Sequence, residues 1–371
     1  MRLALMVDQL RSRVPGGTGR YAAELARALE RTREPADEIA GWVAKGSGGG
    51  LDLPIRIRSL ETPSRLLSRL WERGLGPAPR NSDVVHATTL LVPPTRRSAL
   101  VVTIHDVVPW THPETLTPRG AGFHRRMGAR AAGEADLIVT PTVAVADQVR
   151  HVLAPRAEVI SVPPGFSSDL NVPDDAQERR ARYVGEGGYL LFVGTAEPRK
   201  GLDTLLDSLC ESPLRGQSLV VVGPRGWGGV DVGQQAELRG IGDRVTVTGR
   251  VDDTDLAAMY AGAGLVVMPS RAEGFGLPVL EAMNLGVPVI TSDDPAMREV
   301  GGGATQTFPV GDPTALAAAI VRVLSDSTLR AQMIDEGRKR ALDFDWLDSA
   351  RTMWSLYARL APQQRPSQQP P

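Results

Sequence analysis

The chain has 371 residues, of which 42% are hydrophobic. A chain of this length is longer than one hydrophobic core usually serves, so we expect two domains. The formal net charge of −1 gives no global reason to expect nucleic acid as a partner, because that binding depends on clustered Lys and Arg. The apolar start before Asp8 is too short for a signal peptide, and no run approaches the roughly 18 to 20 residues of a membrane span, so we expect a cytoplasmic protein.

The first half of the chain alternates short apolar runs with amphipathic segments. Helices are predicted at 20–31 and 144–153, where apolar residues recur at helical spacing. The predicted strands are 2–7, 38–44, 83–86, 100–105, 137–140 and 159–162. A polar stretch rich in turn formers, 164–188, is the expected linker between the two domains.

The second half restarts the alternation. Its predicted strands are 189–193, 218–222, 245–248, 265–268 and 287–291. Because helices separate these strands, the sheet should be parallel. An amphipathic helix is predicted at 346–360, and the Pro- and Gln-rich segment 362–371 is predicted to be disordered because it has nothing to bury.

A glycine-rich segment near the N-terminus, from Gly17 to Ala22, fits the dinucleotide-binding pattern G-x-G-x-x-A. We reject a dehydrogenase, because in that pattern the first Gly closely follows the strand, whereas 9–15 intervene here. The required acid should also end the second strand, whereas Asp37 and Glu38 stand at its beginning. We expect a longer glycine loop of a different kind.

A pair of cations follows the first strand of the second half. Gly194 ends that strand at the carboxyl edge, where open α/β sheets bind ligands, and Arg199 and Lys200 follow within one short loop. Arg matches phosphate oxygens with a planar fork, and Lys adds a compact charge. A solvated basic pair is the alternative, but two cations at a helix start oppose the helix dipole, so a bound diphosphate explains them better.

Two carboxylates, Glu273 and Glu281, lie around a glycine-rich helix start with seven residues between them. Pro278 is predicted at the first helical position, which leaves Glu273 in the preceding loop. Gly274 and Gly276 let a ligand approach the backbone, and the first-turn N–H groups can bind an anion. Either acid alone also fits an ordinary place near a helix start. The strand that follows makes a loop–helix–strand unit, which favours a sugar-nucleotide site.

Two further features bear on the chemistry. His105 ends the apolar strand 100–104 at the carboxyl edge, although such a histidine taken alone is more often structural. The D-x-D patterns at 253–255 and 343–345 resemble metal motifs, but Asp253 is expected to cap a helix beginning near Asp255. With no His or Cys cluster at ligand spacing, we expect no metal and no cofactor.

The stretch EGFGLPVLEAMNLGVPVITSD resembles the E-x7-E signature of the retaining glycosyltransferases of family four. The stretches LLFVGTAEPRKGLDTLLDSL and VTVTGRVDDTDLAAMYAGAGLVVMPSRAEGFG match the family in order, and the resemblance runs from about Arg2 to Leu360. It implies an α/β protein with the GT-B fold, in which two Rossmann-like domains with parallel sheets face each other. The implied parts are an N-terminal acceptor domain, 1–170, completed by a last helix that crosses back, 346–361, and a donor domain, 187–345.

The resemblance also implies roles for single residues. A sugar would pass with retention from a nucleoside diphosphate donor to an acceptor hydroxyl, by a front-face route or through a covalent intermediate. The residues expected to act in catalysis are Glu273, His105, Arg199 and Lys200. The acceptor side is expected at Gly16 and Arg20. The residues expected to bind the donor are Gly17, Gly194, Arg199, Lys200, Arg250, Val251, Gly274, Phe275, Gly276, Leu277 and Glu281.

The sequence indicates the identities of the donor and the acceptor less directly than it indicates the fold. GTAEPRKG resembles the form found in bacterial mannosyltransferases of the family, which suggests GDP-mannose, with UDP-sugars next. The acceptor is expected to be a glycan or a lipid-linked glycan. The first domain could bind the inner face of an anionic cell membrane through two groups of basic residues, those at 64–75 and Arg119, Arg125, Arg126 and Arg130. An ordinary solvated basic surface is an equal alternative. A non-catalytic nucleotide-sugar-binding scaffold is the rival class, although it would be expected to lose the charged site residues.

Overall fold

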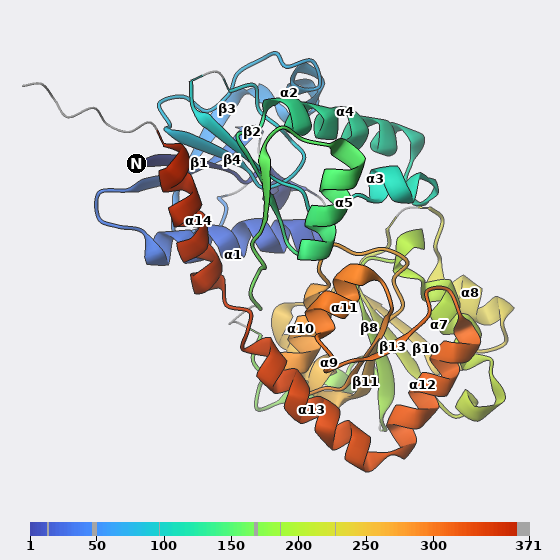
Figure 1. Cartoon of the computed structure of the whole chain (residues 1–371). Helices are drawn as coiled ribbons and strands as arrows, with labels where there is room; N and C mark the ends of the chain where they lie inside the picture. The colour runs from blue at the N-terminus through green and yellow to red at the C-terminus, as the bar shows by residue number, and fades with distance from the viewer. Residues whose placement is uncertain are drawn as a thin grey trace, which may run out of the picture.

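The structure is a computed structural model that describes residues 1–12, 15–46, 50–95, 97–166, 170–185, 187–226 and 228–361. These residues form two α/β units, each built on a parallel sheet (Figure 1). The first sheet has seven strands in the order β3-β2-β1-β4-β5-β6-β7, and the second has six in the order β10-β9-β8-β11-β12-β13. The predicted GT-B fold is therefore confirmed.

The first sheet has a hydrophobic cluster on each face. Its strands are β1 (Arg2–Met6), β2 (Glu38–Lys45), β3 (Arg56–Pro63), β4 (Val84–Ala87), β5 (Ala99–Thr103), β6 (Leu137–Thr140) and β7 (Glu158–Ser161). The helices around it are α1 (Gly16–Thr32), α2 (Ser64–Trp71), α3 (Val108–Thr111), α4 (Pro118–Glu134) and α5 (Val143–Leu153). Every residue of β4 and β6 is buried, because helices cover both faces of the sheet. β3 was not predicted from the sequence; it is an edge strand in which only Leu60 is buried.

The second sheet has one large hydrophobic core. Its edge strands contribute little to this core: β10 adds only the partly buried Val245, and β13 only Phe308. Its strands are β8 (Tyr189–Val193), β9 (Leu219–Val222), β10 (Val245–Gly249), β11 (Ala263–Met268), β12 (Val289–Ser292) and β13 (Gln306–Phe308). Its helices are α6 (Ala176–Ala181), α7 (Leu202–Leu209), α8 (Val232–Leu238), α9 (Asp253–Gly262), α10 (Leu277–Asn284), α11 (Pro295–Gly301), α12 (Pro313–Ser325) and α13 (Ser327–Ala341). The five predicted strands are confirmed within one or two residues. Only β13, a three-residue edge strand, was missed.

The last helix, α14 (Trp346–Leu360), follows α13 in sequence but packs against α1 of the first unit (Figure 1). Trp354 Nε1 donates to the carbonyl of Leu29 at 3.1 Å, and the buried Tyr357 hydroxyl lies 2.6 Å from Nδ1 of His86 on β4. The predicted return of this helix to the first unit is thus confirmed. The division into 1–170 and 187–345 stays a prediction, and the tail expected at 362–371 lies outside the described residues.

Two local predictions are wrong. Gly16, Gly17 and Gly19 form the first turn of α1 rather than a loop, since Pro15 supplies the N-cap and Gly16 takes a left-handed φ of +61°. The cap of α9 is Asp252, whose side chain accepts from Asp255 N at 2.7 Å, so the predicted capping residue Asp253 is instead the first residue of the helix. Among the helices that the structure describes, none is long and apolar enough to cross a membrane.

Candidate active site

The loop after β8 packs directly against the loop after β11, and a glycine makes this close contact possible. The short turn Pro198–Lys200 ends at Gly201, which has a φ of +66°. A Cβ on Gly201 would lie 2.0 Å from the carbonyl oxygen of Pro269, so only glycine lets the two loops pack this closely. This packing brings Arg199 and Lys200 beside Glu273.

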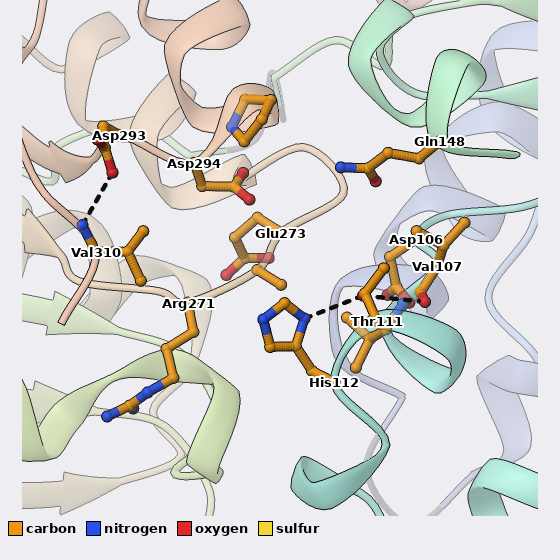
Figure 2. Close-up of a pocket in the computed structure, with 13 residues that line it drawn as sticks. Asp106, Val107, Thr111, His112, Gln148, Arg271, Glu273, Asp293, Asp294 and Val310 are labelled. Atoms are coloured by element: carbon orange, nitrogen blue, oxygen red, sulfur yellow. Dashed lines mark hydrogen bonds between the residues drawn. The ribbon is translucent and has the colours of Figure 1, made fainter. Parts of the chain in front are cut away.

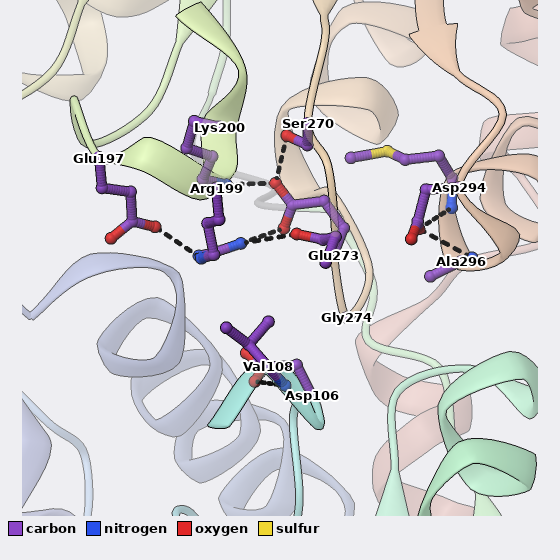
Figure 3. A network of polar contacts seen from close by, with 12 residues as sticks. Asp106, Val108, Glu197, Arg199, Lys200, Ser270, Glu273, Gly274, Asp294 and Ala296 are labelled. Carbon is purple, nitrogen blue, oxygen red and sulfur yellow. Dashed lines mark hydrogen bonds and ion pairs between the residues drawn. The ribbon is translucent and has the colours of Figure 1, made fainter. Parts of the chain in front are cut away.

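Glu273 is the centre of a buried ion-pair cluster (Figure 3). Its Oε1 accepts from Lys200 Nζ and, at 2.7 Å, from Ser270 Oγ. Its Oε2 lies 3.0 Å from Arg199 Nη1. Burial opposes the ionisation of Glu273, but Lys200 and Arg199 outweigh it and lower the pKa to about 2. Three of the four residues predicted to act in catalysis therefore share one network, and Glu273 is an anion at neutral pH.

His105 lies on the first unit, across from this loop. Its Nε2 is 2.8 Å from the carbonyl oxygen of Thr88, and its ring packs edge-on against Tyr21 with centroids 4.7 Å apart. A carbonyl only accepts, so Nε2 carries the proton and Nδ1 of the neutral ring is the acceptor. Burial lowers the pKa of His105, although Thr88 and Asp106 oppose the shift. The ring is therefore neutral near pH 7.

The backbones of the two units touch at His105 and Gly274. A Cβ on Gly274 would lie 1.8 Å from the carbonyl oxygen of His105, and Thr142 Oγ1 donates to the carbonyl of Gly274 at 3.0 Å. Close by, the carboxylate of Glu299 on α11 accepts from Val143 N and Ala144 N, both at 2.8 Å, and so caps α5 of the first unit. These contacts set the distance between the loop after β5 and the loop after β11.

Glu281 lies on α10 and is 3% exposed. Its Oε1 pairs with Arg20 Nη1 at 2.5 Å, and the Tyr260 hydroxyl donates to its Oε2 at 2.8 Å. Arg20 Nη2 also pairs with Asp253 at 2.5 Å. The structure thus joins Arg20, predicted on the acceptor side, directly to Glu281, predicted on the donor side.

The other predicted donor residues differ in their surroundings. A Cβ on Gly17 would meet Leu277 at 4.0 Å, so the first turn of α1 faces the start of α10. The Phe275 side chain packs against Phe344 in the core, which leaves only its backbone for a ligand. Arg250 and Val251 follow β10, the edge strand two places from β8, and so lie apart from the Glu273 cluster. Gly194, by contrast, directly follows β8, and Gly276 is the N-cap residue of α10 with a φ of +90°.

A cleft of about 280 Å³ opens beside Glu273 between the two units (Figure 2). The first unit contributes Asp106, His112 and Gln148, and the second contributes Asp293 and Asp294. Burial raises the pKa of Asp294 to about 6. None of these five was predicted to be a site residue, because each is a single polar residue after a strand, in a turn or on a helix. No three His, Cys, Asp or Glu side chains in the described part of the chain come together as a metal site.

Comparison with known proteins agrees with this geometry. Residues 15–170 match the family described as Glycosyltransferase Family 4, and residues 174–340 match Glycosyl transferases group 1. The O-antigen chain mannosyltransferase B of Escherichia coli is 32% identical over 68% of this chain and 68% of its own. The phosphatidyl-myo-inositol mannosyltransferase of Mycobacterium leprae is 30% identical over 59% of each chain. The D-inositol 3-phosphate glycosyltransferase of Frankia alni is 30% identical over 76% of this chain and 75% of its own.

Solved structures show the same fold. Sucrose-phosphate synthase from Thermosynechococcus elongatus superposes with a TM-score of 0.79 at 22% identity, over 97% of this chain and 99% of its own. Anabaena HepE in complex with UDP-glucose gives a TM-score of 0.72 at 18% identity, over 97% of this chain and all of its own. The fold and the site define an enzyme that transfers a sugar. The chain belongs to glycosyltransferase family 4.

Proposed function

We propose that this enzyme transfers mannose from GDP-mannose, with retention of configuration, to a hydroxyl of a glycan or lipid-linked glycan. The observation that carries the proposal is the convergence of Arg199 and Lys200 on Glu273 where the two units meet. Two relatives named above are mannosyltransferases, which supports the choice of sugar. A UDP-sugar is the second candidate donor, because a structural neighbour was solved with UDP-glucose.

Arg199 and Lys200 would bind the donor diphosphate. In the free enzyme both cations pair with Glu273, and an arriving diphosphate supplies a further anion to them. As the sugar–phosphate bond breaks, negative charge grows on the leaving oxygen, and fixed cations in a buried site stabilise it strongly. The N–H groups at the start of α10 would assist, and the backbone after β10 would meet the base. No metal or cofactor is needed in this scheme.

Glu273 would stabilise the positive charge that develops on the sugar and orient its hydroxyls, rather than attack it. Both of its oxygens are already engaged, Oε1 by Lys200 and Ser270 and Oε2 by Arg199. A carboxylate held this way, with its pKa near 2, is a weak nucleophile. The acceptor hydroxyl would then pass its proton to the departing phosphate oxygen, which is the front-face route. His105 Nδ1 would accept from a sugar hydroxyl.

We also propose a peripheral contact of the first unit with anionic membrane, on the inner face of the cell membrane. In support, Leu66 and Leu75 are about half exposed; Leu66 lies between Arg65 and Arg69 on α2, and Leu75 follows the helix. Arg130 takes no part, because it is bonded to the carbonyls of Trp71 and Val92 and to Glu134. Co-sedimentation with anionic against neutral vesicles tests this contact, and equal binding to both would contradict it.

A thermal-shift panel of GDP-, UDP-, ADP- and dTDP-sugars tests the donor, since a ligand that binds only the native state raises Tm. GDP-mannose should give the largest shift. Lys200→Ala should then abolish release of GDP while leaving the unliganded Tm within a few degrees. Near-wild-type turnover in that variant, or no shift with any nucleotide sugar, would overturn the proposed function.

A further inference from the structure

Glu197 is a buried carboxylate beside the cations, and the function proposed above gives it no role. Its side chain is 2% exposed, and its Oε1 forms an ion pair with Arg199 Nε at 2.7 Å (Figure 3). Its Oε2 is buried and has no hydrogen-bond partner among the described residues. Glu197 precedes Arg199 by two residues in the turn after β8, where the carbonyl of Glu197 accepts from Lys200 N at 3.0 Å.

The guanidinium of Arg199 is held on two of its three nitrogens. Nε faces Glu197, while Nη1 donates to Glu273 at 3.0 Å and to the carbonyl of Ala272 at 3.1 Å. Nη2 makes no hydrogen bond or ion pair with another residue in the described part of the chain. Because the group is planar and rigid, fixing two nitrogens also fixes the direction of the third.

We propose that Glu197 is a positioning residue for donor binding: it holds the Nε edge of Arg199 so that Nη2 stays presented to the diphosphate. The inference rests on the diphosphate role proposed for Arg199. Glu273 alone could not do this, because it contacts only Nη1, the nitrogen that also donates to the carbonyl of Ala272, and the guanidinium would be free to turn about that one nitrogen.

The burial of Glu197 supports a role other than stability. A buried carboxylate oxygen without a partner carries a desolvation cost, and proteins seldom retain such a group without a functional reason. Burial raises the pKa of Glu197, while Arg199 and Lys200 oppose the shift and Glu273 and Asp106 add to it. Gln, which has nearly the same shape without the charge, should therefore fold at least as well at this position.

The test compares ligands with and without phosphates. Binding of GDP and guanosine, and of UDP and uridine, is measured by calorimetry or ligand-observed NMR for the wild type and for Arg199→Ala, Glu197→Ala and Glu197→Gln. Glu336→Ala, an exposed site on α13, is the matched control. We expect Glu197→Ala to weaken the diphosphate roughly tenfold, as loss of a contact to a charged group does. Glu197→Gln should recover part of that loss, and the nucleosides should bind all variants equally.

The outcomes separate this inference from the proposed function. If Arg199→Ala loses diphosphate affinity while Glu197→Ala keeps it, Glu197 does not position Arg199 and only this inference fails. If Glu197→Ala weakens nucleoside and diphosphate alike, or lowers Tm by many degrees, its role is structural and the inference is again wrong. If Arg199→Ala itself binds the diphosphate normally, Arg199 does not bind the diphosphate, and the proposed function is contradicted at that point together with this inference.

Discussion

Arg20 on α1 and Glu281 on α10 form an ion pair of 2.5 Å that joins the two units of the enzyme. Glu281 is 3% exposed, whereas the Arg20 side chain is 26% exposed. Tyr260 holds the second oxygen of Glu281, so a substrate hydroxyl that used Oε1 would have to displace Arg20. The pair therefore holds the units together at Glu281, a residue expected to bind the donor.

Removal of Arg20 should weaken the contact between the units. In Arg20→Ala, Glu281 keeps Tyr260 but loses its cation, and leaving a buried charge unpaired costs about 3 kcal/mol. Unfolding in urea should show this loss, and hydrogen exchange at the start of α10 should rise. Arg351→Ala is the control, because its pair with Asp348 is largely exposed and should be worth less than about 1 kcal/mol. Equal losses of unfolding free energy in the two variants would show that the Arg20–Glu281 pair stabilises the protein no more than an exposed surface pair does.

Glu273 should make stability depend on pH in the acid range. Its pKa is about 2 in the folded protein against 4.5 for the free group, so the folded state favours the ionised form. The resulting stabilisation, about 3 kcal/mol, is fully present above pH 4.5 and is lost as the pH falls toward 2. Urea midpoints measured from pH 7 to pH 3 should therefore fall less steeply in Glu273→Gln than in the wild type. Glu336→Gln should follow the wild-type slope, and a Glu273→Gln curve parallel to the wild type would refute the ion-pair account.

A methyl group on Gly274 should separate the loop after β11 from the loop after β5, which carries His105. In Gly274→Ala the new Cβ would stand 1.8 Å from the carbonyl oxygen of His105, so one of the two backbones must move by more than 1 Å. Misplacement on that scale costs roughly a hundredfold in turnover. Steady-state kinetics should show a large fall in kcat with each sheet still folded. Gly133→Ala on α4, where nothing lies within 4 Å, should keep wild-type kcat and gain up to about 1 kcal/mol of stability. An active Gly274→Ala enzyme would mean that this contact does not set the loop spacing.

Elements with a strong local pattern were predicted well. The helix 346–360 matches α14 at both ends, because the Asp345 cap and the apolar stripe are properties of adjacent residues. The buried strands 137–140 and 189–193 match β6 and β8, since an unbroken apolar run between turns suits a central parallel strand. The edge strands β3 and β13 were missed, as they bury few residues and are held mainly by backbone pairing with a distant neighbour.

The candidate site divides along the same line. Four site residues could be predicted because each lies in a short loop–helix segment whose own sequence indicates anion or sugar binding: Arg199, Lys200, Glu273 and Glu281. The contacts between the two units could not be predicted: Arg20, expected only on the acceptor side, meets Glu281 across 261 residues, and Glu299 caps α5 across about 155. Periodicity carries no information about which surfaces of two separate units will face each other. Those contacts depend on how the two folded units dock, and only that docking decides which buried charges become neighbours.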